Sequence, residues 1–247
     1  MGTKKIAIQT QLWGNGNLEQ NFKPIFDEVI QAGYDGVECR FAVLRQKEEL
    51  KRYLKDRALK IHALHTSPDT FNSENGIKEE FRELLSDMAE FGITNLLISP
   101  SRKSSFDEQV ASLDAAARMA EICRRVGVQL HYHNHDFEFE HGFRLYDEIV
   151  KVPHLGIALD IGWLYRARVP LAEFMERYRS SITYYHVKDT TFEEWRELGT
   201  GDVNMKEAVR LLESVPMEWW TIEQDNSRLA ALQSAQASRS FLRTIVY

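Results

Sequence analysis

The sequence predicts a single (β/α)8 barrel, an α/β fold, formed by residues 1–247. The length of 247 residues is typical of one such barrel. Short apolar runs rich in β-branched residues alternate with longer amphipathic stretches about eight times, and no linker rich in Pro, Gly or Ser separates them. Eight such units, rather than five or six, favour a closed barrel over an open doubly wound sheet.

The order of the elements follows from these patterns. The apolar runs predict strands over residues 5–10, 36–40, 60–65, 95–99, 128–133, 155–160, 182–188 and 219–223. Apolar residues at three- and four-residue spacing predict helices over residues 22–32, 79–91, 108–126 and 205–215. Gly33 and Gly92 are expected to end helices, and Asp107 and Asn204 are expected to cap helix N-termini.

Composition and charge exclude several classes of function. The net charge is −6 and the basic residues are scattered, so nucleic acid is an unexpected partner. Cys39 and Cys123 lie far apart without a CxxC spacing, which argues against disulfides and thiolate zinc sites and favours the cytoplasm. No apolar stretch is long enough for a signal peptide or a membrane span, so no membrane role is expected.

Polar residues stand where the predicted strands end. Because the active site of such a barrel forms at the carboxyl ends of its strands, these residues are the candidates for chemistry: Glu38, His65, His133, Asp160, His186 and Glu223. Each one alone is more often structural, and the set is what favours a site. Side chains alternate across a strand, so Asp160 shares a face with Ala158, while Leu159 is expected to pack under the helices.

Two imidazoles and two carboxylates from this set would surround one divalent ion and leave positions open for substrate oxygens. Such a nitrogen and oxygen site suits Mn2+, Co2+ or Zn2+, and the sequence does not choose among them.

Several segments then resemble a known family. They are AGYDGVE (32–38), YHNHDFEF (132–139), LDIGW (159–163), HVKD (186–189), LGTG (198–201) and IEQD (222–225). Together they resemble the xylose isomerase-like TIM-barrel superfamily, and within it the sugar phosphate isomerases/epimerases, kin to inosose dehydratase and the ketose 3-epimerases. The resemblance extends over essentially the whole chain.

The resemblance implies that Asp160, His186 and Glu223 are metal ligands. The fourth ligand of the family is commonly a glutamate followed by Asn-His, which places His133 at that position. Epimerases of this family use two metal-bound glutamates, so this chain departs from their mechanism. Trp163 also stands where the family usually has a histidine, and an aromatic ring there could stack on a sugar.

The working hypothesis is an isomerase or epimerase that acts on a small sugar or polyol by enediolate chemistry, with the metal as Lewis acid. Glu223 or His133 would be the base, and His65, His135 or Lys188 the proton-delivering partner. Loss of a β-hydroxyl instead would make the protein a dehydratase, which His133 somewhat favours.

Other residues carry weaker expectations. Glu38, Trp13, Trp163 and Arg196 are candidates for substrate binding, although Glu38 could simply pair with Arg40. Lys188 and Asp189 could form a local ion pair that braces a loop. His131 is expected to be a hydrogen-bonded core residue.

Two rival functions stay open on the sequence alone. A relative of the type-four apurinic endonucleases would need more metal ligands and a DNA-attracting surface, which this acidic chain does not offer. A sugar-binding barrel without turnover is the other rival. A homo-oligomer is possible, without a decisive signal for one.

Overall fold

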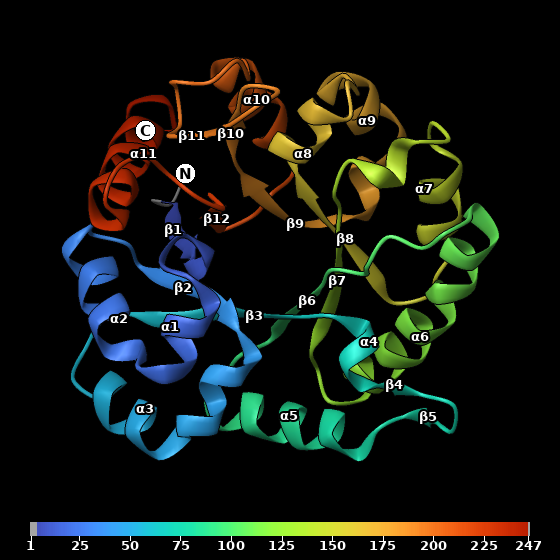
Figure 1. The fold of residues 1–247 in the computed structure, drawn as a ribbon, viewed down its shortest axis with the longest axis horizontal. Coiled ribbons are helices and arrows are strands. Elements are labelled where there is room, and N and C mark those ends of the chain that lie inside the picture. Colours follow the sequence, from blue (N-terminus) through green and yellow to red (C-terminus); the bar gives the residue numbers. More distant parts are fainter. Residues whose placement is uncertain (1–3, 247) are drawn as a thin grey trace.

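The computed structural model describes residues 4–246, so the expected domain of residues 1–247 extends slightly beyond this range. Its main sheet is a closed barrel of parallel strands in the order β1-β12-β9-β8-β7-β6-β3-β2, which confirms the predicted fold. Figure 1 shows the ring of strands with helices around it. The barrel strands are β1 (Lys5–Gln9), β2 (Gly36–Arg40), β3 (Lys60–Thr66), β6 (Asn95–Ile98), β7 (Gln129–His133), β8 (Leu155–Asp160), β9 (Ile182–Val187) and β12 (Trp219–Ile222).

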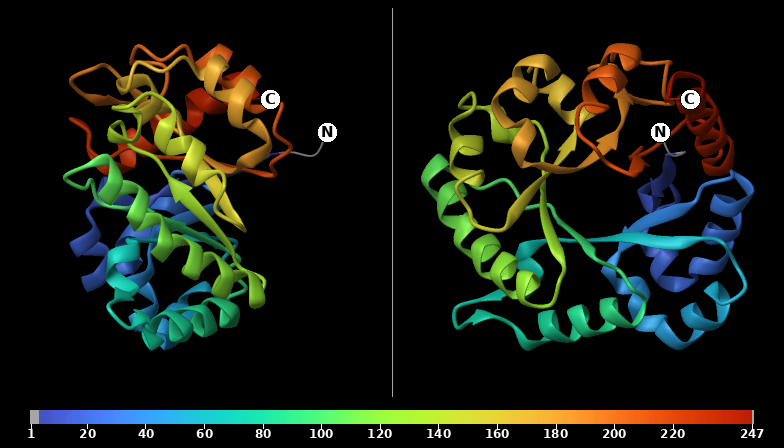
Figure 2. Two further views of the ribbon diagram at one scale, coloured as in Figure 1. Left: turned by 90° about the vertical axis from the view of Figure 1, so that its right-hand side faces the viewer. Right: turned by 180° about the vertical axis from the view of Figure 1, so that it is seen from behind.

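Helices cover the outside of this ring, as the side and rear views also show (Figure 2). The α-helices are α1 (Asn15–Gln20), α2 (Phe22–Gln31), α3 (Lys47–Leu54), α4 (Pro68–Phe71), α5 (Glu79–Glu90), α6 (Phe106–Arg125), α7 (Arg144–Ile149), α8 (Ile161–Arg166), α9 (Leu171–Tyr178), α10 (Met205–Leu212) and α11 (Ala231–Val246). Short 3-10 helices span Thr10–Trp13, Phe41–Gln46, Phe137–Phe139 and Arg179–Ser181. Two small hairpins pair β4 (Asn72–Ser73) with β5 (Gly76–Ile77) and β10 (Asp189–Thr190) with β11 (Trp195–Arg196).

The helix ends confirm three of the four capping predictions. Gly33 and Gly92 have positive φ values of 84° and 65° just after α2 and α5. The Asn204 side chain accepts a hydrogen bond from the Glu207 amide at the start of α10. The prediction for Asp107 is wrong, because α6 begins at Phe106, two residues before the predicted start. Its N-cap is Ser105, whose side chain accepts from the Glu108 amide.

The alternation of side chains along the strands separates two kinds of core. Leu64 and Leu159 belong to the large cluster that also includes residues of the surrounding helices. Ala63, Leu97, Ala158 and Tyr184 form a small separate cluster, as expected for side chains that point into the barrel.

The strand register places the candidate residues at one level. Asp160 is the register partner of His186, and His186 is the partner of Thr221, two residues before Glu223. The carboxyl ends of β8, β9 and β12 therefore present their polar side chains to the same space. Within residues 4–246, no helix is long and apolar enough to cross a membrane.

Candidate metal centre

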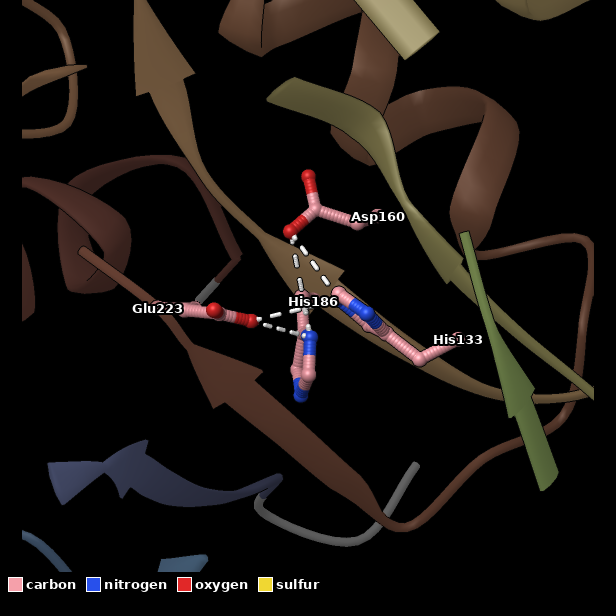
Figure 3. A group of neighbouring side chains, drawn as sticks. All are labelled: His133, Asp160, His186 and Glu223. Atoms are coloured by element: carbon pink, nitrogen blue, oxygen red, sulfur yellow. Dashed lines mark ion pairs between the residues drawn. The ribbon is translucent and has the colours of Figure 1, made fainter. Parts of the chain in front are cut away.

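Four side chains from the carboxyl ends of four neighbouring strands converge in the barrel (Figure 3). They are His133 on β7, Asp160 on β8, His186 on β9 and Glu223 directly after β12. All four are buried, and one ligand atom from each lies within 4.8 Å of the others. The structure therefore brings together the four residues predicted as metal ligands.

The spacing of these atoms suits a small cation. His133 Nε2 lies 3.4 Å from Asp160 Oδ2 and 3.5 Å from Glu223 Oε2. His186 Nδ1 lies 3.9 Å from Asp160 Oδ2 and 2.5 Å from Glu223 Oε2. Ligand atoms about 2.0–2.2 Å from a tetrahedral ion are about 3.3–3.6 Å apart. The two His133 spacings fall in this range, whereas the 2.5 Å spacing would have to lengthen and the 3.9 Å spacing to shorten.

Each of the four residues turns one polar atom to the cluster and gives the other to the protein. Asp160 Oδ1 accepts from the Trp163 amide at 2.9 Å, and Glu223 Oε1 lies 3.3 Å from Lys188 Nζ. His186 Nε2 bonds Glu38, and His133 Nδ1 bonds Ser99.

The atoms that face the cluster have no hydrogen-bond partner within residues 4–246. They are His133 Nε2, Asp160 Oδ2, His186 Nδ1 and Glu223 Oε2, all buried. Buried polar atoms normally find partners, so four such atoms facing one another need an explanation. A divalent ion bound by two imidazoles and two carboxylates provides one, and the cluster could hold a metal ion.

The charges around the cluster favour a cation in the same place. Burial alone would raise the pKa values of Asp160 and Glu223, yet both are lowered, chiefly by the Lys188 ammonium. Burial alone would lower the pKa of His133, but the nearby carboxylates of Asp160 and Glu223 raise it to about 8. The two carboxylates are thus ionised and attract positive charge to the space between them.

Lys188 lies fully buried beside this cluster. Its Nζ is 3.0 Å from Asp225 Oδ2, 3.3 Å from Glu223 Oε1 and 3.6 Å from Asp160 Oδ2. Burial alone would lower the pKa of Lys188, but these three carboxylates raise it. Lys188 therefore carries its charge into the site and pairs with these residues, not with Asp189 as one sequence interpretation had it.

Aromatic rings form a wall next to Lys188. Its ammonium lies 3.9 Å from the ring centroid of Trp195 and 5.2 Å from that of Trp163. Trp163 also contacts His135, with ring centroids 5.3 Å apart. Gly162 makes room for this arrangement, since a Cβ there would come within 2.9 Å of Lys188 Cγ.

Glu38 and His65 lie next to the cluster and are fully engaged by protein groups. Glu38 bonds His186 and Tyr184 through Oε2 and His65 through Oε1. His65 Nε2 bonds Ser99. Burial alone would raise the pKa of Glu38, but the two histidines hold it well below its usual value. Glu38 is thus a buried carboxylate whose partners are these residues, not Arg40.

His131 is a hydrogen-bonded core residue, as predicted. Its Nδ1 bonds Thr183 Oγ1 at 2.8 Å and its Nε2 bonds Asn95 Oδ1 at 3.1 Å. Burial lowers the pKa of His131 to about 3, so the ring is neutral.

Asp189 braces the loop that carries the LGTG segment. Its carboxylate accepts from the amides of Thr190, Gly199, Gly201 and Val203 at 2.8–3.2 Å. A Cβ on Gly201 would come within 2.3 Å of Asp189 Oδ1, so the close approach requires glycine. The role of Asp189 is to hold this loop through its backbone.

The remaining predicted residues lie farther out. Trp13 is in the 3-10 helix after β1, and its indole donates to Glu28 Oε2 at 2.7 Å. Arg196 pairs with Glu194 at 2.9 Å on the β10-β11 hairpin. Their predicted contacts with a substrate stay predictions.

Sequence reasoning missed four residues next to the cluster. Ser99 ended a predicted strand, Tyr184 alternates with His186, and Asp225 follows Glu223 in the IEQD segment, so their positions were visible. Trp195 is on a loop hairpin, where no periodic pattern places a side chain.

Fold and site together define a class of protein, a closed parallel barrel with a buried site that could hold one divalent ion. The chain belongs to the xylose isomerase-like TIM barrel family, whose profile matches residues 26–245. No curated protein sequence matches the chain.

Solved structures share this fold at low sequence identity. A sugar phosphate isomerase/epimerase from Parabacteroides distasonis is 18% identical with a TM-score of 0.81, over 98% of each chain. The IOLI protein, solved with a bound zinc atom, is 19% identical with a TM-score of 0.73, over 98% of each chain. The probable 3-DHS dehydratase AsbF from Bacillus anthracis is 15% identical with a TM-score of 0.75, over 97% of this chain and 98% of that one.

Proposed function

We propose that this protein is a metal-dependent isomerase or epimerase that moves a proton on a small sugar or polyol. The observation that carries the proposal is the set of four buried, unpartnered atoms that face one another at the carboxyl end of the barrel. The family and the enzymes named among its structural neighbours support the same class of reaction.

The cofactor we propose is one Mn2+, Co2+ or Zn2+ ion held by His133, Asp160, His186 and Glu223. When bound, such an ion supplies a Lewis acid that stabilises negative charge on a substrate oxygen. The IOLI structure was solved with a bound zinc atom, which supports metal binding by this fold without deciding the identity of the metal here.

Glu223 is the base we favour for removing the proton next to the substrate carbonyl. Its Oε2 faces the cluster, while its Oε1 contacts only Lys188, at 3.3 Å, among the hydrogen bonds of the described residues. His133 lacks a comparable spare atom, because its second nitrogen bonds Ser99. Glu223 Oε1 keeps a lone pair beyond its contact with Lys188, so it can come within hydrogen-bond reach of the substrate proton, and we therefore favour Glu223 over His133.

Lys188 is the partner we favour for delivering a proton or stabilising the new charge. Its ammonium lies beside Glu223, whereas both nitrogens of His65 are engaged by Glu38 and Ser99. His135 is the alternative, since its Nδ1 is buried and has no hydrogen-bond partner in the described part of the chain. Trp163, with Trp13 and Arg196 farther out, would contact the substrate.

A dehydratase is the second candidate. The ammonium of Lys188 next to the base Glu223 could protonate a departing hydroxyl on the side from which the proton was taken. His133, in place of a second glutamate, leaves no matching carboxylate to return a proton on the opposite face.

The test is solvent deuterium exchange in metal-loaded protein, with a panel of ketoses and inososes. We expect deuterium to be incorporated into at least one substrate of the panel. An isomerase or epimerase would also form an isomer or epimer, whereas a dehydratase would form a product that has lost one water molecule. Glu223→Gln should slow exchange by about 10²–10⁴-fold. The exposed Glu83→Gln is the matched control. Absence of exchange with every substrate would favour the sugar-binding rival.

A further inference from the structure

The two histidines of the candidate metal centre share one hydrogen-bond network, which passes through the carboxylate of Glu38. We propose that Glu38 is the positioning residue that determines which nitrogen of both His186 and His133 carries its hydrogen. It acts on His186 directly and on His133 through His65 and Ser99. This inference rests on the proposed metal site.

The contacts form a continuous chain. Glu38 Oε2 lies 2.7 Å from His186 Nε2, and Glu38 Oε1 lies 2.9 Å from His65 Nδ1. His65 Nε2 lies 2.6 Å from Ser99 Oγ, which lies 3.0 Å from His133 Nδ1. Glu38 is fully buried and His65 is 5% exposed, so water does not readily replace these partners.

The carboxylate gives the chain a direction. An ionised carboxylate only accepts hydrogen bonds, so His186 must carry its hydrogen on Nε2 and His65 on Nδ1. The neutral His65 ring then presents a lone pair at Nε2, which accepts the single hydrogen of the Ser99 hydroxyl. Ser99 in turn can only accept from His133, so His133 carries its hydrogen on Nδ1.

Both histidines thereby turn a bare nitrogen to the cluster. The free atoms are Nδ1 of His186 and Nε2 of His133, and neither has a hydrogen-bond partner among residues 4–246. A metal ion binds the unprotonated nitrogen, and a partner on the opposite nitrogen fixes the tautomer. One carboxylate on β2 therefore prepares two ligands on β7 and β9.

The network makes a distinctive prediction for Glu38→Gln, which keeps the size of the side chain. The amide offers one acceptor and one donor, so one of its two histidine neighbours must now accept. If that neighbour is His186, its hydrogen moves to Nδ1. If it is His65, the Ser99 hydroxyl turns and His133 carries its hydrogen on Nε2. Either orientation places a hydrogen at the metal position.

The experiment measures the dissociation constant for Zn2+ by competition with a chromophoric chelator. We expect Glu38→Gln to weaken binding by about 10–100-fold, the usual effect of losing such a partner. Ser99→Ala should weaken it by about 10-fold, and Ser99→Thr, which keeps the hydroxyl, should restore it. Thr183→Val is the control, because it removes a hydrogen bond from His131 and leaves the network intact.

Nitrogen-15 spectra of the imidazoles in Zn2+-loaded protein provide the second readout. We expect the hydrogen on Nε2 of His186 and on Nδ1 of both His65 and His133. The opposite assignment for His186 or His133 would overturn the proposal, and so would unchanged Zn2+ affinity in Glu38→Gln. If Glu38→Gln does not fold, the Ser99 pair decides: equal affinities of its alanine and threonine variants overturn the relay.

These outcomes separate the two proposals. Wild-type protein that binds no Zn2+ would overturn the metal site itself, and with it both proposals. Tight binding with the expected tautomers, but no exchange on any sugar, would overturn only the proposed catalysis.

Discussion

His131 and His133 lie two residues apart on β7, and both are almost fully buried, with 1% and 2% exposure. His131 has a protein partner on each nitrogen, Thr183 and Asn95. His133 has Ser99 on one nitrogen and leaves the other free toward Asp160 and Glu223. Residue type and burial are therefore the same, and the unfilled hydrogen-bonding position distinguishes the candidate ligand from the structural residue.

The largest difference between His131 and His133 should appear when each histidine is replaced by glutamine. His133→Gln should weaken Zn2+ binding by more than about 100-fold, because losing a ligand should exceed the effect of losing an outer partner. His131→Gln should leave Zn2+ affinity unchanged. Isothermal titration of both variants checks this, and equal losses would show that the cluster does not single out His133.

A second difference should appear in the pH dependence of stability. Burial would lower the pKa of His133 in the metal-free protein, but the nearby carboxylates of Asp160 and Glu223 outweigh this effect and raise it to about 8. The raised pKa of His133 contributes about 2 kcal/mol to the free energy of unfolding. This contribution is fully present below about pH 6.5 and is lost as the pH rises through about 8. A metal must displace this proton, so it binds more weakly as pH falls below that value.

The gap in Tm between metal-loaded and metal-free protein should therefore widen from about pH 6 to about pH 8.5. Thermal melts with and without chelator measure it. Because the pKa of His131 is lowered to about 3, that residue does not titrate between pH 6 and pH 8.5 and does not contribute to the change. A gap that narrows with rising pH would contradict the assignment of His133 as a ligand.

Asp189 extends the comparison to a carboxylate whose oxygens are all engaged. Asp189→Asn replaces one accepting oxygen by an amide group that donates, and this group then faces backbone amides that also donate. We therefore expect a loss of about 1–3 kcal/mol in the free energy of unfolding. Zn2+ affinity should change little, since Asp189 is not in the cluster. Urea denaturation and metal titration of the same variant test both parts.

The smallest expected effect concerns the partner of His131. Thr183→Val should lower the free energy of unfolding by about 1 kcal/mol, because it removes the hydrogen bond between Thr183 and His131. The loss is small because Thr183 is exposed. Equilibrium unfolding measures this change. An accompanying loss of metal affinity would mean that the two histidines on β7 are not independent.

Much of the fold could be predicted because the spacing of apolar residues and the alternation of strands with helices can both be followed along the sequence. The predicted strand 36–40 matches β2, and 155–160 matches β8. Closure followed from counting eight units. The prediction of Asp107 as an N-cap was wrong because Ser105, two residues earlier, is an equally suitable cap. The sequence does not show which of the two residues has the extended backbone of an N-cap.

The site was predictable in its members but not in its hydrogen bonds. Strand ends placed His133, Asp160, His186 and Glu223 at one end of the barrel. The link between Glu38 on β2 and His186 on β9 spans 148 positions in the chain, so no local spacing announces it. The same holds for Lys188, whose partner Asp225 is fixed only by the barrel register.

The placement of the Lys188 ammonium over the ring of Trp195 has an optical consequence. Indole emission responds to a nearby charge, and Trp163 lies against the same ammonium. A metal ion that binds Glu223 and Asp160 would weaken their attraction for the Lys188 ammonium and so change its position relative to the two rings. We therefore expect the tryptophan emission of the protein to change when a metal ion binds, a signal that needs no added label.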